Sequence, residues 1–377
     1  MMIRHREINA RHVRPSSQVL VTEALSAGWF LDKVEVMDPT GKTWVFPCDA
    51  WFGHDPSSGI EGTLERRLSP LPQDAAEEDL ELEVDGTIGR KKVKQRQIGA
   101  LSFTPSAVAI PELNKVKEGT RGVNKKGFGY GGEDSYFYSE TDKLIALGVA
   151  DGVYAWREQG IDPGEMSRSL MQHASEAIQG GAQDPLLILS NAWYKAYHNE
   201  VKGSSTATLV TINKLNGTLQ SALLGDSGFV IIGITPSRPY LHIKYRSPHH
   251  EHSFGHPFQL GHHDHSDRPE DALISRLHVS PGDVIVMGSD GLFDNVHDED
   301  ILALVKNEFE EAEKKSMAVT PSSMCQALVK LAFENSMDRF AQTPYALAAT
   351  ETFDMVFQGG KPDDITVLCA LVSEAKP

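Results

Sequence analysis

Five short segments of the sequence carry an acidic residue directly after an apolar stretch, beside glycine or a second acidic residue. They are residues 131–134 (GGED), 147–152 (LGVADG), 223–228 (LLGDSG), 286–295 (VMGSDGLFDN) and 359–367 (GGKPDDITV). A strand that ends in this way pushes a carboxylate out of the core, and glycine lets the chain turn closely around whatever the carboxylate binds. Each segment alone is typical of an Asp-Gly turn. Five of them in one domain favour a shared function.

Carboxylates that gather at strand ends repel one another unless they are protonated or neutralised. If these five segments converge, we therefore expect bound cations between them. No cysteine or histidine lies within the five motifs, and a donor set made only of oxygen atoms favours Mg²⁺ or Mn²⁺ over zinc. The sequence predicts a site for divalent cations.

The segments lie in a region where strands and helices alternate irregularly. Asp162-Pro-Gly-Glu165 predicts a helix start, and Met166, Leu170 and Ala174 then recur at helical spacing until Gly180. We expect a second helix after Asp184 and two more near 298–308 and 321–340. Strands are expected near 206–212, 218–224, 228–234, 241–245, 283–288 and 364–372. This order is typical of an α+β fold.

The first 69 residues have a different, all-β pattern. Residues 29–36 (WFLDKVEV) and 43–46 (TWVF) flank the turn sequence DPTG and predict a hairpin. Together with 44–52 and 59–68, this pattern resembles the closing half of a PLAT/LH2 β-sandwich, which implies a lipid or protein contact through Trp29, Trp51 and Phe52. Aromatic residues at strand spacing are also typical of a core. Residues 70–97 are acidic and then basic, and predict a charged linker.

The ordered set GED, DG, GSSTA, GDS, GDVIVMGSDGLFDN and DDITV resembles the metal-dependent protein phosphatases of the PP2C (PPM) family. VADGV, PFQL and GGKPDDIT resemble its PTC7-type branch. The resemblance covers residues 98–377 and implies a β-sandwich flanked by helices. It implies hydrolysis of phosphoserine and phosphothreonine by a metal-activated water, without a covalent phosphoenzyme.

The resemblance also implies the residues that hold the ions. Asp151 would bridge two ions, with the carbonyl of Gly152 on one of them and with Asp290 and Asp363 on the other.

Further acidic residues are implied at the margin of this site. Glu133 and Asp134 would hold metal-bound waters, and Asp226 resembles the residue that, with Asp290, binds a third and weaker ion in some members. We therefore expect two Mg²⁺ or Mn²⁺ ions, and three if Asp226 and Asp290 also hold one.

Two residues depart from the pattern of many family members. Val153 follows Asp151-Gly152 where a histidine often stands as the suggested general acid, and Gly129 stands where an arginine often binds the substrate phosphate. Lys125 and Lys126 precede the site and are candidates for the missing positive charge. The alternative is that both are exposed lysines beside a glycine-rich turn.

Composition excludes several other classes. The formal net charge of −16 disfavours binding to nucleic acid, and no apolar run is long enough to predict a membrane span. Three scattered cysteines indicate a reducing compartment, so we expect an intracellular protein. The resemblance to the PTC7-type branch implies mitochondria or plastids, and the cytoplasm stays open as the alternative. Seven histidines in 249–265 suggest either a zinc site or a solvent-facing flap.

Two other functions remain open from the sequence. The same metals are suited to hydrolysis of small phosphate esters, and a non-catalytic adaptor is possible if the N-terminal segment recruits a membrane or a partner.

Overall fold

The structure is a computed structural model that describes residues 101–235 and 237–375, together with the backbone of five strands nearer the N-terminus. The chain divides into two compact units, Met1–Arg96 and Gln97–Pro377. Each unit is described by itself. Among the described residues, no helix is both long and apolar enough to cross a membrane.

The N-terminal unit contains the expected hairpin. Its strands are β1 (Arg6–Asn9), β2 (Val19–Val21), β3 (Trp29–Met37), β4 (Thr43–Phe52) and β5 (Arg66–Leu68). β3 and β4 pair antiparallel, β1 adds to β3 in parallel, and β2 pairs with β5. The side chains of Trp29, Trp51 and Phe52 and the linker 70–97 lie outside the described residues, so the choice between core and contact surface stays open.

Two antiparallel sheets form the C-terminal unit. The seven-stranded sheet has the order β19-β13-β12-β10-β9-β8-β7, and the five-stranded sheet has the order β15-β14-β20-β21-β6. The first contains β7 (Gly122–Lys125), β8 (Phe128–Gly131), β9 (Asp134–Glu140), β10 (Leu144–Asp151), β12 (Ala207–Asn213), β13 (Thr218–Leu224) and β19 (Leu273–His278). The second contains β6 (Leu101–Ile110), β14 (Gly228–Thr235), β15 (Arg238–Arg246), β20 (Val284–Gly288) and β21 (Ile365–Glu374).

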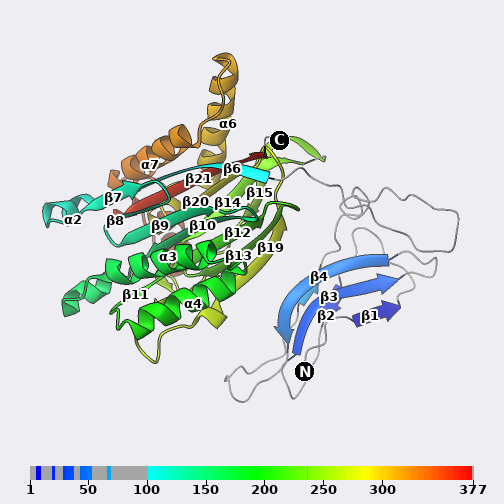
Figure 1. Cartoon of the computed structure of the whole chain (residues 1–377), viewed down its shortest axis with the longest axis horizontal. Coiled ribbons are helices and arrows are strands. Elements are labelled where there is room, and N and C mark those ends of the chain that lie inside the picture. The colour runs from blue at the N-terminus through cyan, green and yellow to red at the C-terminus, as the bar shows by residue number, and fades with distance from the viewer. Residues whose placement is uncertain are drawn as a thin grey trace. The chain divides into compact units, whose positions relative to one another are not determined.

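Helices cover the outer faces of the two sheets (Figure 1). The larger helices are α3 (Pro163–Gln179), α4 (Pro185–His198), α6 (Asp298–Lys314) and α7 (Pro321–Met337), and the shorter ones are α2 (Leu113–Lys117), the 3₁₀ helix η1 (Tyr154–Gln159), α5 (Asp290–Phe293) and α8 (Pro344–Phe353). α3 and α4 pack on the seven-stranded sheet, whereas α6 and α7 pack on the five-stranded sheet. The result is the four-layered α+β sandwich expected from the sequence.

The predicted start of α3 is present. Asp162 caps the helix by accepting a hydrogen bond from the Gly164 amide at 3.0 Å, and Pro163 occupies the first turn. Asp184 caps α4 in the same way through the Leu187 amide. These caps fix where both helices begin, and η1 connects the acidic end of β10 to α3.

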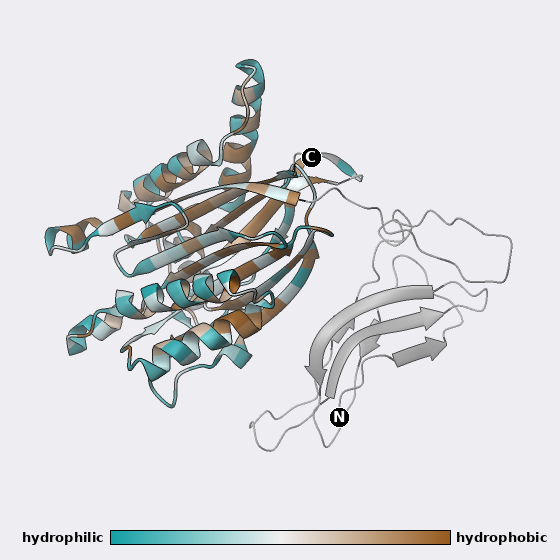
Figure 2. Cartoon of the chain, in the orientation of Figure 1, coloured by the Kyte–Doolittle hydropathy of each residue, from teal (hydrophilic) through white to brown (hydrophobic). Residues whose placement is uncertain are grey.

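Alternation along β10 determines which way its acidic end points. Ile145, Leu147 and Val149 pack between the two sheets, whereas Leu144, Ala146 and Ala150 pack against the helices. Figure 2 shows the apolar strands between polar outer helix faces. Since side chains alternate with a period of two, Asp151 continues the row that faces the other sheet.

Candidate metal centre

Asp134 and Asp151 face each other at the end of the seven-stranded sheet. They are direct partners in the antiparallel register of β9 and β10, and like charges placed opposite each other in this way are destabilising. The backbone of Asp151 is fixed by the neighbouring segment, because its amide donates to Thr206 Oγ1 at 3.1 Å and its carbonyl accepts from Ser205 Oγ at 2.8 Å. The fold therefore holds two carboxylates together against their repulsion.

The five-stranded sheet contributes Asp290 and Asp363. Asp290 begins α5 directly after β20, and Asp363 lies just before β21. Ser289 links the two sheets, because its hydroxyl donates to Asp134 Oδ2 at 2.6 Å and accepts from the Thr366 amide at 3.1 Å. Four of the sequence-predicted aspartates are thus brought to one end of the sandwich.

Glycine is required where the chain passes this end. A Cβ on Gly132, which has a φ of +66°, would overlap the carboxyl group of Asp364. A Cβ on Gly291 would overlap the Asp364 carbonyl oxygen, and a Cβ on Gly152 that of Pro163. The glycines beside the acidic residues therefore have the role expected from the sequence, which is close approach of the backbone.

Burial and mutual repulsion raise the pKa of several of these carboxyl groups. The pKa of Asp151 is raised by burial and then by the charges of Asp134, Asp290, Asp363 and Asp226. The pKa of Asp134 is raised by burial and by Asp364. Groups this deeply coupled cannot all be ionised without a positive charge among them.

Lys361 supplies one such charge and was missed by the sequence reasoning, although it stands inside the GGKPDDIT motif. Its ammonium group contacts Asp290 Oδ2 and lies 2.8 Å from Asp294 Oδ2 and 3.7 Å from Asp363 Oδ2. Asn295 fixes the Lys361 backbone through hydrogen bonds of 2.9 Å to its amide and carbonyl. Although burial opposes it, Lys361 lowers the pKa of Asp290.

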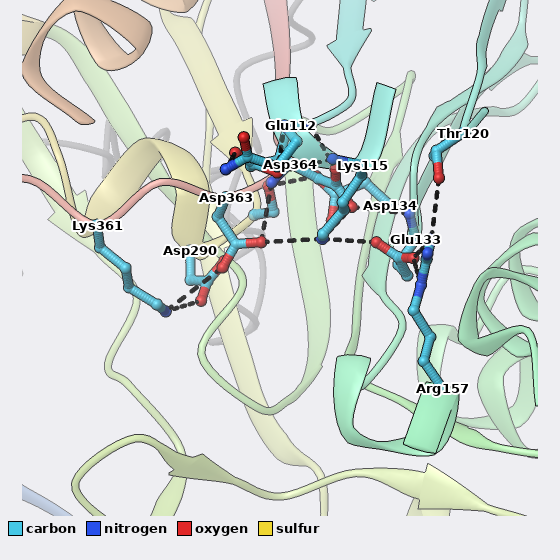
Figure 3. Close-up of polar contacts among 12 residues, drawn as sticks. Glu112, Lys115, Thr120, Glu133, Asp134, Arg157, Asp290, Lys361, Asp363 and Asp364 are labelled. Carbon is cyan, nitrogen blue, oxygen red and sulfur yellow. Dashed lines mark hydrogen bonds and ion pairs between the residues drawn. The ribbon is translucent and has the colours of Figure 1, made fainter. Parts of the chain in front are cut away.

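Lys115 supplies the second positive charge, on the opposite side of Asp363 (Figure 3). Its ammonium group lies 2.6 Å from Glu133 Oε2, 2.9 Å from Asp364 Oδ2 and 3.4 Å from Asp363 Oδ1. Asp364 also accepts from the Glu112 and Glu133 amides at 2.7 and 2.8 Å. The second aspartate of the DDIT motif therefore ties together α2, the β8–β9 turn and the start of β21.

Both carboxylate oxygens of Glu133 are engaged in ion pairs. Oε2 meets Lys115, and Oε1 accepts from Arg157 Nε at 2.7 Å. These partners and Asp364 hold the pKa of Glu133 at about 2 despite its burial. The expected role of Glu133 in holding a metal-bound water stays a prediction. Any such water would share a carboxylate oxygen of Glu133 with Lys115 or Arg157.

Unpartnered oxygen atoms show that this set of residues fits divalent cations. Asp134 Oδ1, Asp226 Oδ1 and Asp290 Oδ1 are buried without a hydrogen-bond partner, and such oxygens are costly unless something binds them. Within the described part of the chain, no three acidic, histidine or cysteine side chains are already arranged around an ion position. The donor set is nevertheless oxygen-only, which suits Mg²⁺ and Mn²⁺.

Asp226 lies at the same end of the sandwich, between β13 and β14, and is 8% exposed. Its pKa is raised by burial and then by Asp290, while Lys361 lowers it. Asp226 and Asp290, the two residues expected to bind a third ion, therefore lie near each other. The ammonium group of Lys361 also lies near both.

The structure does not bring Lys125 and Lys126 to this centre. Both are exposed at the turn between β7 and β8, whereas the acidic end of β8 is at Gly131, three register positions away. At Gly129 a Cβ would lie 2.5 Å from both the Tyr136 hydroxyl and the Val123 carbonyl oxygen. The ring of Tyr136 thus occupies the space that a side chain at position 129 needs.

The histidines of residues 249–265 pack on aromatic rings, on one another and on the backbone. His250 and His252 each stack on Phe258 with ring centroids 3.7 Å apart, and His252 pairs with Asp267 at 3.0 Å. His262 Nδ1 bonds to the Gly203 backbone. No metal cluster forms among these described residues, so the arrangement favours the flap over the zinc site.

Comparison with known proteins gives consistent results. The chain is 36% identical over 294 residues to a protein phosphatase PTC7 homolog from Drosophila virilis, covering 73% of this chain and 91% of the relative. It is 34% identical over 298 residues to a PTC7 homolog from Danio rerio, covering 75% and 96%. The X-ray structure of the photosystem II phosphatase PBCP is similar with a TM-score of 0.60 and 28% identity, over 73% of this chain and all of that one.

No family model matches the chain, so the PLAT/LH2 resemblance of the N-terminal segment gains no support. The two PTC7 relatives cover 73% and 75% of the chain, and the solved structure shares its sandwich. The chain therefore belongs to the PTC7-type branch of the PP2C family of serine/threonine protein phosphatases.

Proposed function

We propose that this chain hydrolyses phosphoserine and phosphothreonine in proteins with the help of divalent cations held by Asp151, Asp290 and Asp363 and by the carbonyl of Gly152. The observation that carries the proposal is the convergence of buried carboxylates with unpartnered oxygens, Asp134 Oδ1 and Asp290 Oδ1 among them. When bound, Mg²⁺ or Mn²⁺ lowers the pKa of water and neutralises the phosphoryl oxygens.

The protein's own groups orient the reactants around that chemistry. Ser289 holds Asp134 Oδ2 at 2.6 Å, which leaves Asp134 Oδ1 free to accept a hydrogen bond from the attacking water. Thr206 and Ser205 keep Asp151 in place through its backbone. Orientation of this kind is a large part of catalysis in phosphoryl transfer.

Water rather than a side chain is the nucleophile in this proposal. Cys325 and Cys369, whose side chains are described, are both fully buried and cannot reach a phosphoester at the centre. Val153 cannot donate a proton, so the leaving alkoxide takes its proton from water.

We propose two ions rather than three. The ammonium group of Lys361 contacts Asp290 Oδ2 and Asp294 Oδ2, and its charge also acts on Asp226, the other residue expected to hold a third ion. Asp290 Oδ1 stays unpartnered, so Asp290 has one oxygen for Lys361 and one for a divalent ion. A fixed ammonium charge at this corner makes a third ion unnecessary.

Purified protein with Mn²⁺ and a phosphoserine or phosphothreonine peptide tests the proposal. We expect turnover that requires Mn²⁺ or Mg²⁺ and that falls by at least a hundredfold in Asp290→Asn. Absence of turnover, or turnover that Asp290→Asn leaves intact, would refute it. Higher kcat/KM for small metabolite esters than for every phosphopeptide would favour the small-ester alternative, and binding of phosphopeptides without hydrolysis would favour the adaptor.

A further inference from the structure

A polar cavity of about 670 Å³ lies beside the metal centre. Its walls are the loop between α2 and β7, the end of β8, and the chain from η1 to the first turns of α3. Three arginines line it, namely Arg121, Arg157 and Arg168. None of them was singled out by the sequence, because they come from three separate elements.

Hydrogen bonds to Glu133 and Thr120 hold Arg157 in place. Its Nε donates to Glu133 Oε1 at 2.7 Å and its Nη2 donates to Thr120 Oγ1 at 3.0 Å. Nη1 has only Glu118 nearby, at 3.7 Å, and Glu118 is mostly exposed. A guanidinium has five N–H donors, so Arg157 is oriented by one edge and has donors left on the other.

Arg168, on α3, is held in a similar way. Its Nη2 lies 2.5 Å from Asp162 Oδ2, and its guanidinium carbon lies 5.1 Å from the ring centre of Tyr130. Nη1 makes only a long 3.5 Å contact with the Gly132 carbonyl. Because a stacked and paired guanidinium has already lost much of its rotamer entropy, a ligand that binds it loses little more.

Arg121 adds a third positive charge at the rim. It is exposed and makes no ion pair with any residue that the structure describes. The acidic groups in the lining are Glu118 and Asp162, and the buried Glu133 behind the wall already has Lys115 as a second partner. The cavity therefore carries an excess of positive charge, although the whole chain has a net charge of −16.

The cavity is close to the reacting centre. A continuous chain of contacts joins Arg157 to Glu133 at 2.7 Å, Glu133 to Lys115 at 2.6 Å and Lys115 to Asp363 at 3.4 Å (Figure 3). This series of contacts spans on the order of 10 Å, a distance that about three residues of an extended peptide cover.

We propose that Arg121, Arg157 and Arg168 form an anion subsite for the substrate chain. It binds an oxyanion, either a carboxylate or a second phosphate, on a residue within about three positions of the phosphorylated residue being hydrolysed. Planar guanidinium groups match both oxyanions through paired hydrogen bonds. This inference rests on the proposed phosphatase function, and it assigns to the enzyme a preference for acidic or multiply phosphorylated sequences.

The test compares kcat/KM for three phosphoserine peptides of equal length in the presence of Mn²⁺. One has neutral neighbours, one has glutamate within three positions on either side, and one has a second phosphoserine there. We expect the wild-type protein to prefer an acidic peptide over the neutral one by about tenfold or more, the size of one or two charged hydrogen bonds. A higher kcat/KM for the glutamate peptide would identify a carboxylate as the preferred ligand of the subsite, and a higher kcat/KM for the doubly phosphorylated peptide would identify a phosphate.

Two variants attribute the preference to the cavity. In Arg121→Gln/Arg168→Gln, the ratio of kcat/KM for the preferred peptide to that for the neutral peptide should fall to about one. Arg121→Gln alone changes an exposed side chain and should lower the ratio without affecting folding. Arg238→Gln, an exposed arginine on β15, is the matched control and should keep the wild-type ratio.

The outcomes separate the subsite from the underlying activity. If all three peptides turn over equally well, or if the double variant keeps the preference, the subsite is refuted while the phosphatase function stands. If neither p-nitrophenyl phosphate nor any phosphopeptide is hydrolysed with Mn²⁺, both proposals are refuted.

Discussion

Gly129 stands where related phosphatases often carry a phosphate-binding arginine, and the structure predicts that no side chain can be restored there. A Cβ at position 129 would lie 2.5 Å from the Tyr136 hydroxyl, 2.6 Å from its Cζ and 2.5 Å from the Val123 carbonyl oxygen. Tyr136 is 1% exposed and packs between the two sheets. Relief of the overlap requires a movement of about 1 Å in a closely packed interior.

Overpacking of this size costs about 1–3 kcal/mol. For a folding unit of this size, each kcal/mol corresponds to about 2–4 °C in Tm, so Gly129→Ala should lower Tm by about 2–12 °C. Thermal and denaturant unfolding of the metal-loaded protein measure the change. Gly129→Arg should be at least as destabilised and should not raise kcat/KM for phosphopeptides.

Two further variants make this prediction specific. Gly129→Ala/Tyr136→Phe should remain destabilised, because the ring carbon and the Val123 carbonyl still obstruct the Cβ. Gly180→Ala is the matched control, since Gly180 has a helical φ of −74° at the end of α3 and its nearest neighbour would lie 3.3 Å from the new Cβ; its stability should change by less than about 1 kcal/mol. A Gly129→Ala protein as stable as the wild type would show that Tyr136 and the Val123 carbonyl do not obstruct a side chain at position 129.

Three further substitutions test other parts of the centre. Lys361→Met removes the ammonium group from Asp290 and Asp294, so the metal-free protein should lose about 3–5 kcal/mol of stability. A third Mn²⁺ should then bind to this variant. Unchanged stability and an unchanged number of bound ions would show that Lys361 does not balance these carboxylates. Ser289→Ala removes the hydrogen bond to Asp134 and should lower Mn²⁺ affinity or kcat by about 10–100-fold. Metal titration and turnover assays measure the two quantities. An affinity and a rate equal to those of the wild type would show that Ser289 does not orient Asp134. His249 lies beside Arg246, with its Nε2 3.3 Å from Arg246 Nη2, and within reach of the charge of Asp290. Burial and then Arg246 lower the pKa of His249 below its usual 6.5, so the imidazole is neutral at pH 7 and His249→Gln should keep kcat within about twofold. A loss of a hundredfold, the scale of a lost general acid, would show that His249 donates the proton.

The sequence was a good guide to the aspartates because their signal is local. An apolar strand followed by Asp and Gly specifies both the position of the carboxylate and the turn around it, and β10 with Asp151 follows this pattern closely. The helices α3 and α4 were predicted for the same reason, since the caps Asp162 and Asp184 and the apolar spacing lie within a few residues of one another.

Elements with weak local patterns were missed. β6 contains Pro105, which disfavours a strand, and it is tolerated because β6 is the outermost strand of its sheet. The buried residues of α8, Ala346 and Ala349, are too small to mark an apolar face.

The basic residues of the site had no local signal. Lys115 meets Asp363 across 248 positions of the chain, and Arg157 meets Glu133 only after β9 and β10 have paired. Nothing near these residues in the sequence indicates their partners. The sequence therefore predicts where negative charge gathers, whereas the fold determines which positive groups balance it and where phosphate recognition is possible.

If these aspartates hold divalent ions, a direct count of bound Mn²⁺ shows it without depending on turnover. Titration of the metal-free protein, followed by the electron paramagnetic resonance signal of free Mn²⁺, should give two bound ions for the wild type. Asp151→Asn removes the carboxylate expected to bridge both and should weaken both by at least tenfold. A wild-type protein that binds no Mn²⁺, or an Asp151→Asn protein that still binds two ions with the original affinity, would contradict this account.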